Sequence, residues 1–446
     1  METKPGEELT EVTLILDMHP TEFIPIRERF LAGLAGQLRC EPGDLLITSI
    51  RPGCTKVTIR MTSDRAVETL ALANANKPEA DEFRVEFGIR SAHFSEHIVL
   101  VRRDGREFTW MHISDIHFEE EGGPHAASQE RVKIAFLNDL PEVLGADDLV
   151  PDAVFVTGDI AQRAHTVEYD KALDFLTRLK DRLPERSAPI MVVPGNHDVQ
   201  RDVVARHQAE EDAALKLLIS NDSIIDYLKS KKTQQDRDRV FARLDNFFAF
   251  AAKCAPLGQP PMNHRYFYTT ELAHKGLKIG VAGLNSAWRC SSDQDPGRLI
   301  LGVPQIDQAL QDLAASDLRL LLLHHPVESP WFVNEDQIYQ RQQLAKFDFI
   351  LRGHEHDPHA VSLNQLHAAP SYRFAAGALY THERFPKSVN AVRLNLDHGS
   401  ARLFYWRLSP AKYEWVPDVD FHRAGSVQFP LTPHSKARLA ARGLPL

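Results

Sequence analysis

Five short apolar runs, each followed at once by polar residues and then by a helical pattern, constrain the fold of this chain more than any other sequence feature. They lie at residues 108–114, 153–157, 190–194, 318–323 and 347–351. Buried strands that alternate with helices are typical of a layered α/β fold. Ligands of such folds gather at the carboxyl ends of the strands, so the residues after each run are the first candidates for chemistry.

The first hundred residues show a different order of elements. Strand patterns at 12–16, 45–50, 56–61 and 83–89 and helical patterns at 21–38 and 63–73 give the order β-α-β-β-α-β, with a turn signal at 51–54. This order predicts a ferredoxin-like α+β domain at residues 1–97. In its element order and strand-turn-strand centre, the segment resembles the small adaptor modules fused to effectors in bacterial conflict systems. That resemblance implies a role in protein–protein or self association.

A second domain is expected at residues 98–430, with a mostly helical insertion at about 199–256 and strands of a second sheet between 371 and 406. The last residues, 431–446, are expected to form a loose tail. The insertion mixes cations with carboxylates, which is typical of a solvated helix face, although a cap with cations facing substrate phosphates stays open. The cations in question are Lys229, Lys231, Lys232, Arg237, Arg239 and Arg243.

Composition limits the class of protein and its partners. With 43% apolar and 25% charged residues, the 446-residue chain has the content of a folded protein of more than one domain. Its 52 basic and 61 acidic side chains give a net charge of −9, which argues against a broad nucleic-acid-binding surface. An acidic start and no run of about 18 apolar residues predict a cytoplasmic protein without a membrane partner. Four cysteines without a CxxC pair indicate buried thiols.

Polar clusters stand where the five apolar runs end. A single cluster is weak evidence, because a lone histidine beside an apolar strand is more often a hydrogen-bonded core residue than a ligand. Five clusters in order at strand ends predict one shared site with carboxylate, amide and imidazole donors, which suit Mn, Fe or Zn. The clusters are Asp115-Ile116-His117, Gly158-Asp159, Gly195-Asn196-His197-Asp198, His324-His325-Pro326 and Gly353-His354-Glu355-His356.

These ordered blocks, D-x-H, G-D, G-N-H-D, H-H-P and G-H-x-H, resemble those of the calcineurin-like metallophosphoesterase family over roughly residues 108–400. The resemblance implies a four-layer α-β-β-α sandwich and two divalent metal ions, Mn, Fe or Zn, with a bridging hydroxide as nucleophile. It implies that Asp159 bridges both ions. The remaining ligands would be Asp115, His117 and His356 at the first ion, and Asn196, His324 and His354 at the second.

The resemblance also implies roles beside the ligands. His197 is expected to contact the phosphate and protonate the departing oxygen, and Asp198 to orient a ligand or His197. His324 is favoured over His325 as the ligand of the H-H-P block, which leaves His325 a packing role. No role is assigned to the neighbouring residues His112, His165, His359, Arg352 and Asn285.

Departures from the family pattern bear on the substrate. Protein phosphatases of this superfamily extend the second block to G-D-x-x-D-R-G, whereas residues 158–163 read G-D-I-A-Q-R. The G-D-I-A form and the H-H-P block look more like the branch that cleaves phosphodiesters. A phosphodiesterase acting on nucleotide or nucleic-acid esters is therefore the leading hypothesis, with a phosphomonoesterase or a nuclease as alternatives. From another class, the protein could be an assembly or signalling module of a defence-type system, acting through its N-terminal domain.

Overall fold

The protein is described by a computed structural model, and its chain divides into two compact units. The first holds Met1–Val101 and Gly145–Asp148, and the second holds Arg102–Leu144 and Leu149–Leu446. The structure describes residues 9–16, 18, 20–51, 55–62, 65, 68–69, 86–87, 89–94, 106–262, 265–292, 295–327, 331–363, 371–380 and 385–444. No helix in these ranges combines the length and apolar character that a membrane crossing requires.

The first unit contains an antiparallel sheet with the strand order β2-β3-β1-β4. Its strands are β1 (Leu9–Leu16), β2 (Leu46–Arg51), β3 (Thr55–Thr62) and β4 (Ile89–Phe94), and its helices include α1 (Pro20–Phe23) and α2 (Arg27–Gln37). Val12, Phe23, Phe30 and Val57 are buried in its own core. This unit therefore has the means to fold around its own apolar side chains.

Of the strand expected at residues 83–89, the structure describes only Glu86, Phe87 and Ile89; Glu86 and Phe87 are not in a strand, and β4 begins at Ile89. The ring of Phe87 packs edge-on against that of Phe30 at 5.1 Å. The alternation of apolar residues that suggested a strand places Phe87 in the core without pairing it to β1. Most of the helix expected at 63–73, and the hairpin-type turn at Asp104-Gly105, lie outside the described residues.

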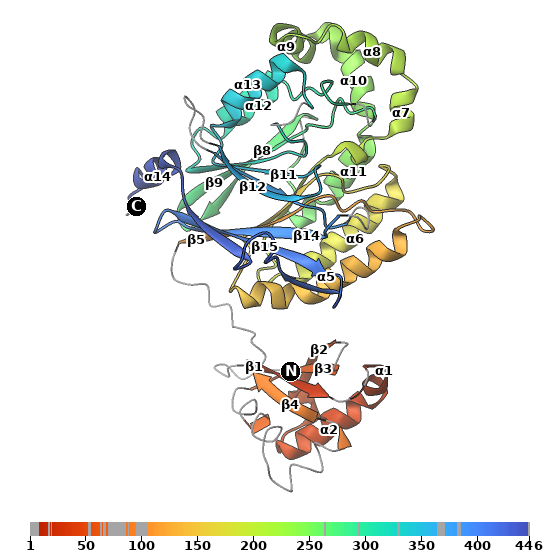
Figure 1. Cartoon of the computed structure of the whole chain (residues 1–446), viewed down its shortest axis with the longest axis vertical. Coiled ribbons are helices and arrows are strands. Elements are labelled where there is room, and N and C mark those ends of the chain that lie inside the picture. The colour runs from red at the N-terminus through yellow and green to blue at the C-terminus, as the bar shows by residue number, and fades with distance from the viewer. Residues whose placement is uncertain are drawn as a thin grey trace. The chain divides into compact units, whose positions relative to one another are not determined.

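The second unit is built on two mixed sheets (Figure 1). One has the order β12-β13-β11-β10-β9-β8 and the other β16-β15-β14-β5-β6-β7, with β17 paired to β15. Their bounds are β5 Glu107–Ile113, β6 Ala153–Thr157, β7 Ile190–Val193, β8 Phe267–His274, β9 Leu277–Leu284, β10 Leu318–Leu322, β11 Phe349–Arg352, β12 Pro358–Leu363, β13 Ser371–Ala376, β14 Ser388–Asn395, β15 Ser400–Ser409, β16 Glu414–Pro417 and β17 Ser426–Pro430. The expected layered α/β fold is confirmed.

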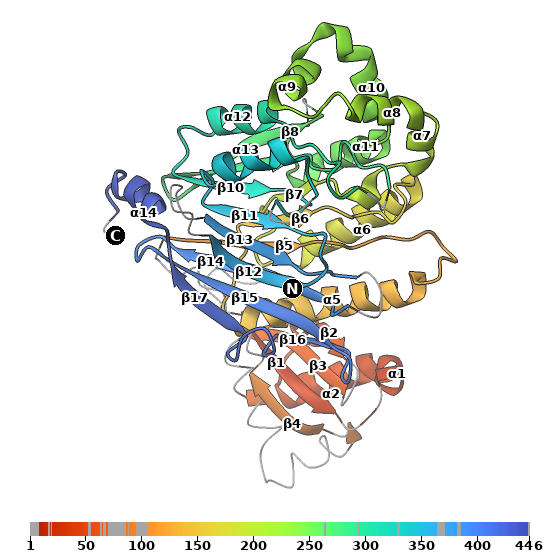
Figure 2. The same ribbon diagram turned by 45° about the horizontal axis from the view of Figure 1, so that its top comes forward.

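The apolar runs are continuous because both faces of their strands are buried. Along β6, Ala153 and Phe155 face a core shared with the other sheet, where the ring of Trp110 meets that of Phe349 at 5.2 Å. The alternate residues Val154 and Val156 face a second cluster that the outer helices supply. The two sheets thus pack face to face, and helices cover their outer faces (Figures 1 and 2).

The outer helices follow the strands in sequence. They are α5 Ala126–Ala146 and α6 Thr166–Arg182 beside the seven-stranded sheet, and α12 Val303–Asp312 and α13 Asn334–Leu344 beside the six-stranded sheet. The stretch from 199 to 256 holds α7 Arg201–Ala205, α8 Gln208–Leu215, α9 Asn221–Lys229, α10 Gln234–Ala242 and α11 Asp245–Lys253. Figure 2 shows α7 to α10 gathered at one end of the second unit.

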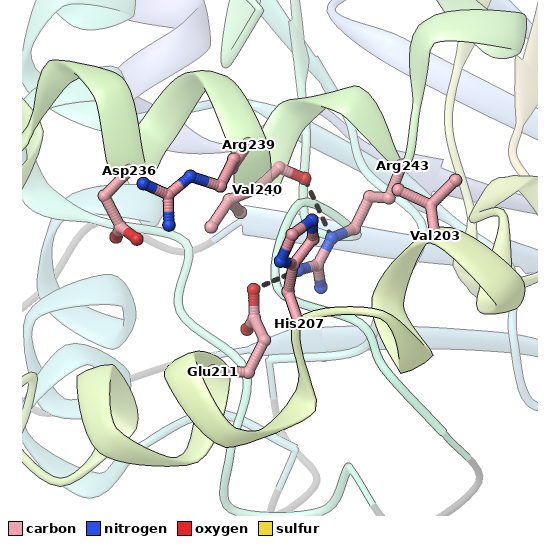
Figure 3. A pocket seen from close by; sticks show the side chains of 7 residues that line it. All are labelled: Val203, His207, Glu211, Asp236, Arg239, Val240 and Arg243. Carbon is pink, nitrogen blue, oxygen red and sulfur yellow. Dashed lines mark hydrogen bonds and ion pairs between the residues drawn. The ribbon is translucent and has the colours of Figure 1, made fainter.

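Two cations of the insertion hold its own structure together. Arg243 is buried and forms an ion pair with the buried Glu211 (Figure 3). It also donates to the carbonyl oxygen of Cys290 at 2.8 Å. Glu211 also pairs with Arg289 at 3.1 Å. Arg237 donates to the carbonyl oxygen of Ser230 at 2.7 Å. These two arginines are therefore fixed by local partners, in contrast to the exposed Lys229, Lys231 and Lys232.

Two expectations for the C-terminal part are wrong. The stretch 371–406 does not form one second sheet, because β13 joins the six-stranded sheet while β14 and β15 join the seven-stranded one. The last residues are not a loose tail, because helix α14 (Pro433–Ala440) packs Leu439 into the core between the sheets. Arg442 pairs with Asp317 at 2.6 Å and fixes the end of that helix.

Candidate metal centre

The residues expected to form the site all lie in loops that follow strands. Asp115 and His117 follow β5, Asp159 follows β6, and the 3₁₀ turn Asn196–Asp198 follows β7. On the other sheet His324 follows β10, and His354 and His356 follow β11. The strands within each group are parallel, so their carboxyl ends lie at one edge of each sheet. The structure brings all seven expected ligands together from these loops.

Five of these residues have a left-handed backbone that non-glycine residues rarely adopt. The φ angle is 53° at Asp115, 51° at His117, 50° at Asp159, 77° at His354 and 61° at His356. Each such residue costs on the order of 1–3 kcal/mol, and strain of this kind gathers at functional sites. The loops therefore hold these side chains in directions that relaxed loops would not give them.

Gly158 and Gly353, the first residues of two of the blocks, lie where a larger residue does not fit. A Cβ atom on Gly158, whose φ is 91°, would lie 2.6 Å from Nδ1 of His324 and 2.8 Å from the backbone nitrogen of Gly195. A Cβ atom on Gly353 would overlap the side chains of Ser114 and Asp115. Larger residues would push these loops apart, so the glycines permit the close approach of the ligand-bearing loops.

The first ligand cluster consists of Asp115, His117, Asp159 and His356, whose ligand atoms lie within 4.8 Å of one another. Nε2 of His356 is 3.3 Å from Oδ1 of Asp115, and Nε2 of His117 is 3.8 Å from Oδ2 of Asp159. Both ring nitrogens of His117 are buried without a hydrogen-bond partner among the described residues. An unpartnered buried imidazole between two carboxylates fits a cation at this position.

The second cluster contacts the same carboxylate of Asp159. Oδ2 of Asp159 is 3.2 Å from Nε2 of His324, and Oδ1 of Asn196 is 3.1 Å from the same nitrogen and 2.9 Å from Nδ1 of His354. Nδ1 of His324 donates to the carbonyl oxygen of Thr157 at 2.7 Å, which turns Nε2 toward Asp159. Oδ2 of Asp159 thus faces both clusters, a position from which a carboxylate can bridge two cations.

His325 belongs to the same group of histidines but has other partners. Its ligand atom lies within 4.8 Å of those of His324 and His354. Nδ1 of His325 forms a hydrogen bond of 2.9 Å with the hydroxyl of Ser286, and Nε2 is 3.7 Å from the sulfur of Cys290. Because both ring nitrogens have protein partners, His325 is better suited to supporting His324 than to binding a metal ion.

The charge of the site favours cations. Burial, together with His197, lowers the pKa of His117 to about 3, and burial, together with His324, lowers that of His354 to about 3. Both rings are therefore neutral, the form that binds a metal ion. For His324, burial lowers the pKa, but the carboxylate of Asp159 outweighs it and raises the pKa to about 9. The carboxylate of Asp159 thus stabilises a positive charge at His324, and it would stabilise a metal ion there in the same way.

His197 lies beside the first cluster. Its backbone nitrogen donates to Oδ1 of Asp159 at 2.8 Å, and its ring packs edge-on against that of His117 at 4.6 Å. Nδ1 of the ring donates to the carbonyl oxygen of Gln162 at 2.9 Å. This bond fixes the ring and leaves Nε2 available to a group outside the cluster.

Asp198 contacts the loops that carry two of the expected ligands. Its buried carboxylate accepts hydrogen bonds from the backbone nitrogens of Ile160 at 3.2 Å, Ala161 at 3.0 Å and Gly195 at 2.9 Å, and from the hydroxyl of Tyr169 at 2.9 Å. Asp198 therefore ties the loop after β6 to the loop after β7. Of the two roles expected of Asp198, orienting a ligand or orienting His197, these contacts favour the first, because they hold the loops that carry Asp159 and Asn196.

Three residues that hold the ligands were missed by the sequence reasoning. Ser286, which follows β9, accepts from the backbone nitrogens of His324 and His325 at 3.3 and 3.2 Å. Gln129 on α5 donates to the carbonyl oxygen of His117, and Thr157 supplies the carbonyl that orients His324. Thr157 and Ser286 had a signal, since Thr157 ends an apolar run and Ser286 follows one; the contact of Gln129 depends on tertiary packing.

The neighbouring residues without an assigned role have ordinary structural partners. His112 hydrogen-bonds Thr157 at 2.8 Å in the core, and His165 precedes α6 and meets Glu120 at 2.6 Å. Asn285 donates to the carbonyl oxygen of Arg265 at 3.0 Å, and Arg352 pairs with Glu355 at 2.8 Å. The side chain of His359 lies outside the described residues.

Comparison with known proteins gives a family match and one distant curated relative. The family model for calcineurin-like phosphoesterases matches residues 108–358, more than half of the chain. The uncharacterized metallophosphoesterase-like protein YydB of Bacillus subtilis (strain 168) is 22% identical over 310 residues. The aligned part covers 67% of this chain and 59% of that protein. No comparison supports a likeness of the first unit to adaptor modules.

Solved structures add little to this. A conserved uncharacterized protein of Streptococcus pneumoniae TIGR4, described as a predicted phosphoesterase, is 13% identical, with 73% of this chain and 98% of that chain covered and a TM-score of 0.27. Vacuolar Protein Sorting 29 from Cryptosporidium parvum is 13% identical, with 73% and 98% covered and a TM-score of 0.30. Scores this low carry no argument about function.

Proposed function

Because the chain belongs to the calcineurin-like phosphoesterase family, we propose that it is a phosphodiesterase that uses two divalent metal ions, Mn, Fe or Zn. The observation that carries the proposal is the position of Asp159. Its Oδ2 atom faces His117 of the first cluster at 3.8 Å and His324 of the second at 3.2 Å. A carboxylate shared by two ligand clusters is the arrangement that holds two cations close together.

The seven expected ligands divide into two sets that share Asp159. Asp115, His117 and His356 would hold one ion with Asp159, and Asn196, His324 and His354 would hold the other with the same carboxylate. When bound, the ions would supply a water nucleophile at neutral pH and neutralise the charge of the phosphoryl group. The protein's part is to fix the donors, which the strained loops and Asp198 do.

His197 is the proposed proton donor. Its ring lies against His117 at 4.6 Å, and the bond from Nδ1 to Gln162 keeps Nε2 directed away from the loop. A proton on Nε2 can pass to the oxygen that leaves phosphorus, which makes that oxygen a better leaving group. His197→Ala should therefore slow esters of alcohols far more than esters of nitrophenol, whose leaving oxygen needs no proton.

The second block supports diesters over phosphoproteins. The chain lacks the D-R-G extension, and the backbone nitrogens of Ile160 and Ala161 are occupied by Asp198 at 3.2 and 3.0 Å. Phosphomonoesters and nucleic acid stay as alternative substrates, because the ligand set alone does not separate them. A role of the first unit in assembly or signalling is a separate proposal, which deletion of that unit tests below.

The test compares bis(p-nitrophenyl) phosphate with p-nitrophenyl phosphate in Mn²⁺, for the wild type and Asp159→Asn. We expect the diester to be turned over faster, and we expect Asp159→Asn to lose activity and bound metal together, because both ions share this carboxylate. Asp174→Asn, at a side chain that is 67% exposed, is the matched control. An Asp159→Asn protein with full activity and two bound ions would refute the proposal. If the wild type turns over the monoester faster than the diester, the protein is instead a phosphomonoesterase.

A further inference from the structure

Two half-buried aromatic side chains border the metal centre, one at each ligand cluster. The ring of Trp331 meets that of His354 edge-to-face at 4.2 Å and 89°. The ring of Phe385 meets that of His356 at 5.0 Å and 78°. Neither ring is a ligand, and both touch histidines that carry ligand atoms.

The exposure of Trp331 sets it apart from the other tryptophans. The structure describes all five tryptophans of the chain, and Trp110, Trp288, Trp406 and Trp415 are between 0% and 5% exposed, whereas Trp331 keeps part of its surface in water. Leaving apolar aromatic surface in water is unfavourable, so a half-buried tryptophan beside a polar site suggests that something covers it.

Hydrogen bonds hold the backbone from which each ring projects. The carbonyl oxygen of Trp331 accepts from the nitrogen of Leu299 at 3.0 Å, and the next residue, Phe332, is buried. The carbonyl oxygen of Phe385 accepts from Nζ of Lys387 at 3.1 Å, and Lys387 forms a bridge with Ala378. Together with the contacts to His354 and His356, this restrains the rings before a ligand stacks on them, which lowers the conformational cost of binding.

The two rings end two series of rings that cross the site. From His197 the first series runs through His117 at 4.6 Å and His356 at 5.5 Å to Phe385. From His324 the second runs through His354 at 5.2 Å to Trp331. A phosphoryl group held between the clusters would therefore have an aromatic wall on either side.

The chemistry of these walls favours a flat apolar group over a second phosphate. Arg352, the cation of the loop that carries His354 and His356, is buried and paired with Glu355 at 2.8 Å, so its charge is already balanced. Aromatic side chains bind nucleobases and aryl groups by stacking, and such contacts tolerate many ring types.

We propose that Trp331 and Phe385 select esters whose phosphorus carries a flat aromatic group, such as a nucleoside or an aryl group. This inference rests on the phosphodiesterase function proposed above and narrows its substrate class. The two residues are specificity-determining walls and take no part in bond breaking. Replacing either residue should lower kcat/KM for aromatic esters more than for aliphatic esters.

The experiment compares two diesters with the same leaving group, thymidine 5′-(p-nitrophenyl) phosphate and methyl p-nitrophenyl phosphate, in saturating Mn²⁺. We expect Trp331→Leu and Phe385→Leu each to lower the ratio of kcat/KM for the thymidine ester to that for the methyl ester about tenfold, mainly through KM. Trp331→Tyr should restore most of the ratio. Phe421→Leu, at a half-buried ring packed on Tyr405 at 3.8 Å, should leave the ratio unchanged.

A binding measurement separates this inference from the proposed function. Calorimetric titration should show thymidine 5′-monophosphate binding to the manganese-loaded wild type, and its dissociation constant should rise about tenfold in Trp331→Leu. Wild-type protein that binds the nucleotide but turns over neither diester would refute the phosphodiesterase alone. Turnover with an unchanged ratio in both leucine variants, or no binding of the nucleotide by the wild type, would overturn the aromatic walls.

Discussion

The ligand residues show how backbone strain serves the site. Asp115, His117, Asp159, His354 and His356 are all held at positive φ, although only glycine adopts such angles freely. Loops under this strain relax unless the surrounding structure holds them, and Asp198 is the residue that holds two of them. Its carboxylate binds the loops after β6 and β7 through three backbone nitrogens.

At the residue scale we predict that Asp198→Asn weakens metal binding more than it slows chemistry. The amide would replace an acceptor with a donor that faces backbone N–H groups, so the loops carrying Asp159 and Asn196 would shift. Loss of a residue that supports metal ligands typically costs about 10–100-fold in metal affinity or activity. Manganese titration by calorimetry, together with kcat at saturating metal, measures the two effects separately.

Tyr169→Phe is the matched control for this prediction. It removes one neutral donor to Asp198 and should cost about 0.5–1.5 kcal/mol, so its effect on metal affinity should be the smaller of the two. If Asp198→Asn keeps normal metal affinity but loses turnover, the side chain acts in catalysis and the positioning role is wrong.

At the scale of elements, the hairpin of β8 and β9 places Ser286 beneath His324 and His325. Its two-residue turn, Lys275-Gly276, has φ angles of 48° and 83°, and the register pairs His274 with Leu277. Two positive φ angles in a two-residue turn are typical of the type I′ turn, in which asparagine followed by glycine is preferred. Lysine at the first position is therefore strained.

We predict that Lys275→Asn stabilises the protein by about 0.5–1 kcal/mol, because asparagine tolerates the left-handed conformation better than lysine. Gly276→Ala should destabilise it by a similar amount, since alanine adds a Cβ atom at positive φ. Chemical denaturation of both variants gives the comparison. Lys275 and Gly276 are both exposed, so the metal content should not change. A destabilised Lys275→Asn protein would show that another contact of Lys275 outweighs the strain.

At the scale of the molecule, each unit has its own apolar core. The first unit buries Val12, Phe30 and Val57, and the second buries two clusters, one between its sheets and one beneath its helices. The ligand residues all belong to the second unit. Metal binding should therefore stabilise the second unit without help from the first.

We predict that Mn²⁺ raises the unfolding temperature of chelator-treated protein, and that deleting residues 1–97 leaves this shift intact. A ligand at 100 times its dissociation constant stabilises the folded state by about 2.7 kcal/mol, which corresponds to several degrees. Differential scanning calorimetry of both chains measures the shift. A shift that vanishes on deletion would mean that the first unit is required for the metal centre.

The same deletion tests the proposed role of the first unit. Altered oligomer size with unchanged turnover would support a role in protein–protein or self association, whereas an altered Michaelis constant would point to substrate handling. If neither changes, an assembly role for this unit loses its support. Size-exclusion chromatography and the diester assay supply both readouts.

The sequence alone determined the family, the layered α/β class and the residues that meet at the site. It could do so because each block, such as Asp115-Ile116-His117, is a local pattern at the end of a strand, and the parallel strands bring such ends together. The polar clusters needed no knowledge of distant contacts to be recognised as candidate ligands.

Only the tertiary structure decided which distant groups each side chain meets. It assigned β13 and β14 to different sheets, turned Asp198 toward backbone nitrogens, and set Trp331 against His354. The physical reason is that strand pairing and loop strain depend on residues far apart in the chain, as when β14 pairs with β5. A pattern of neighbouring residues carries no record of such partners, whereas packing the two sheets together determines them.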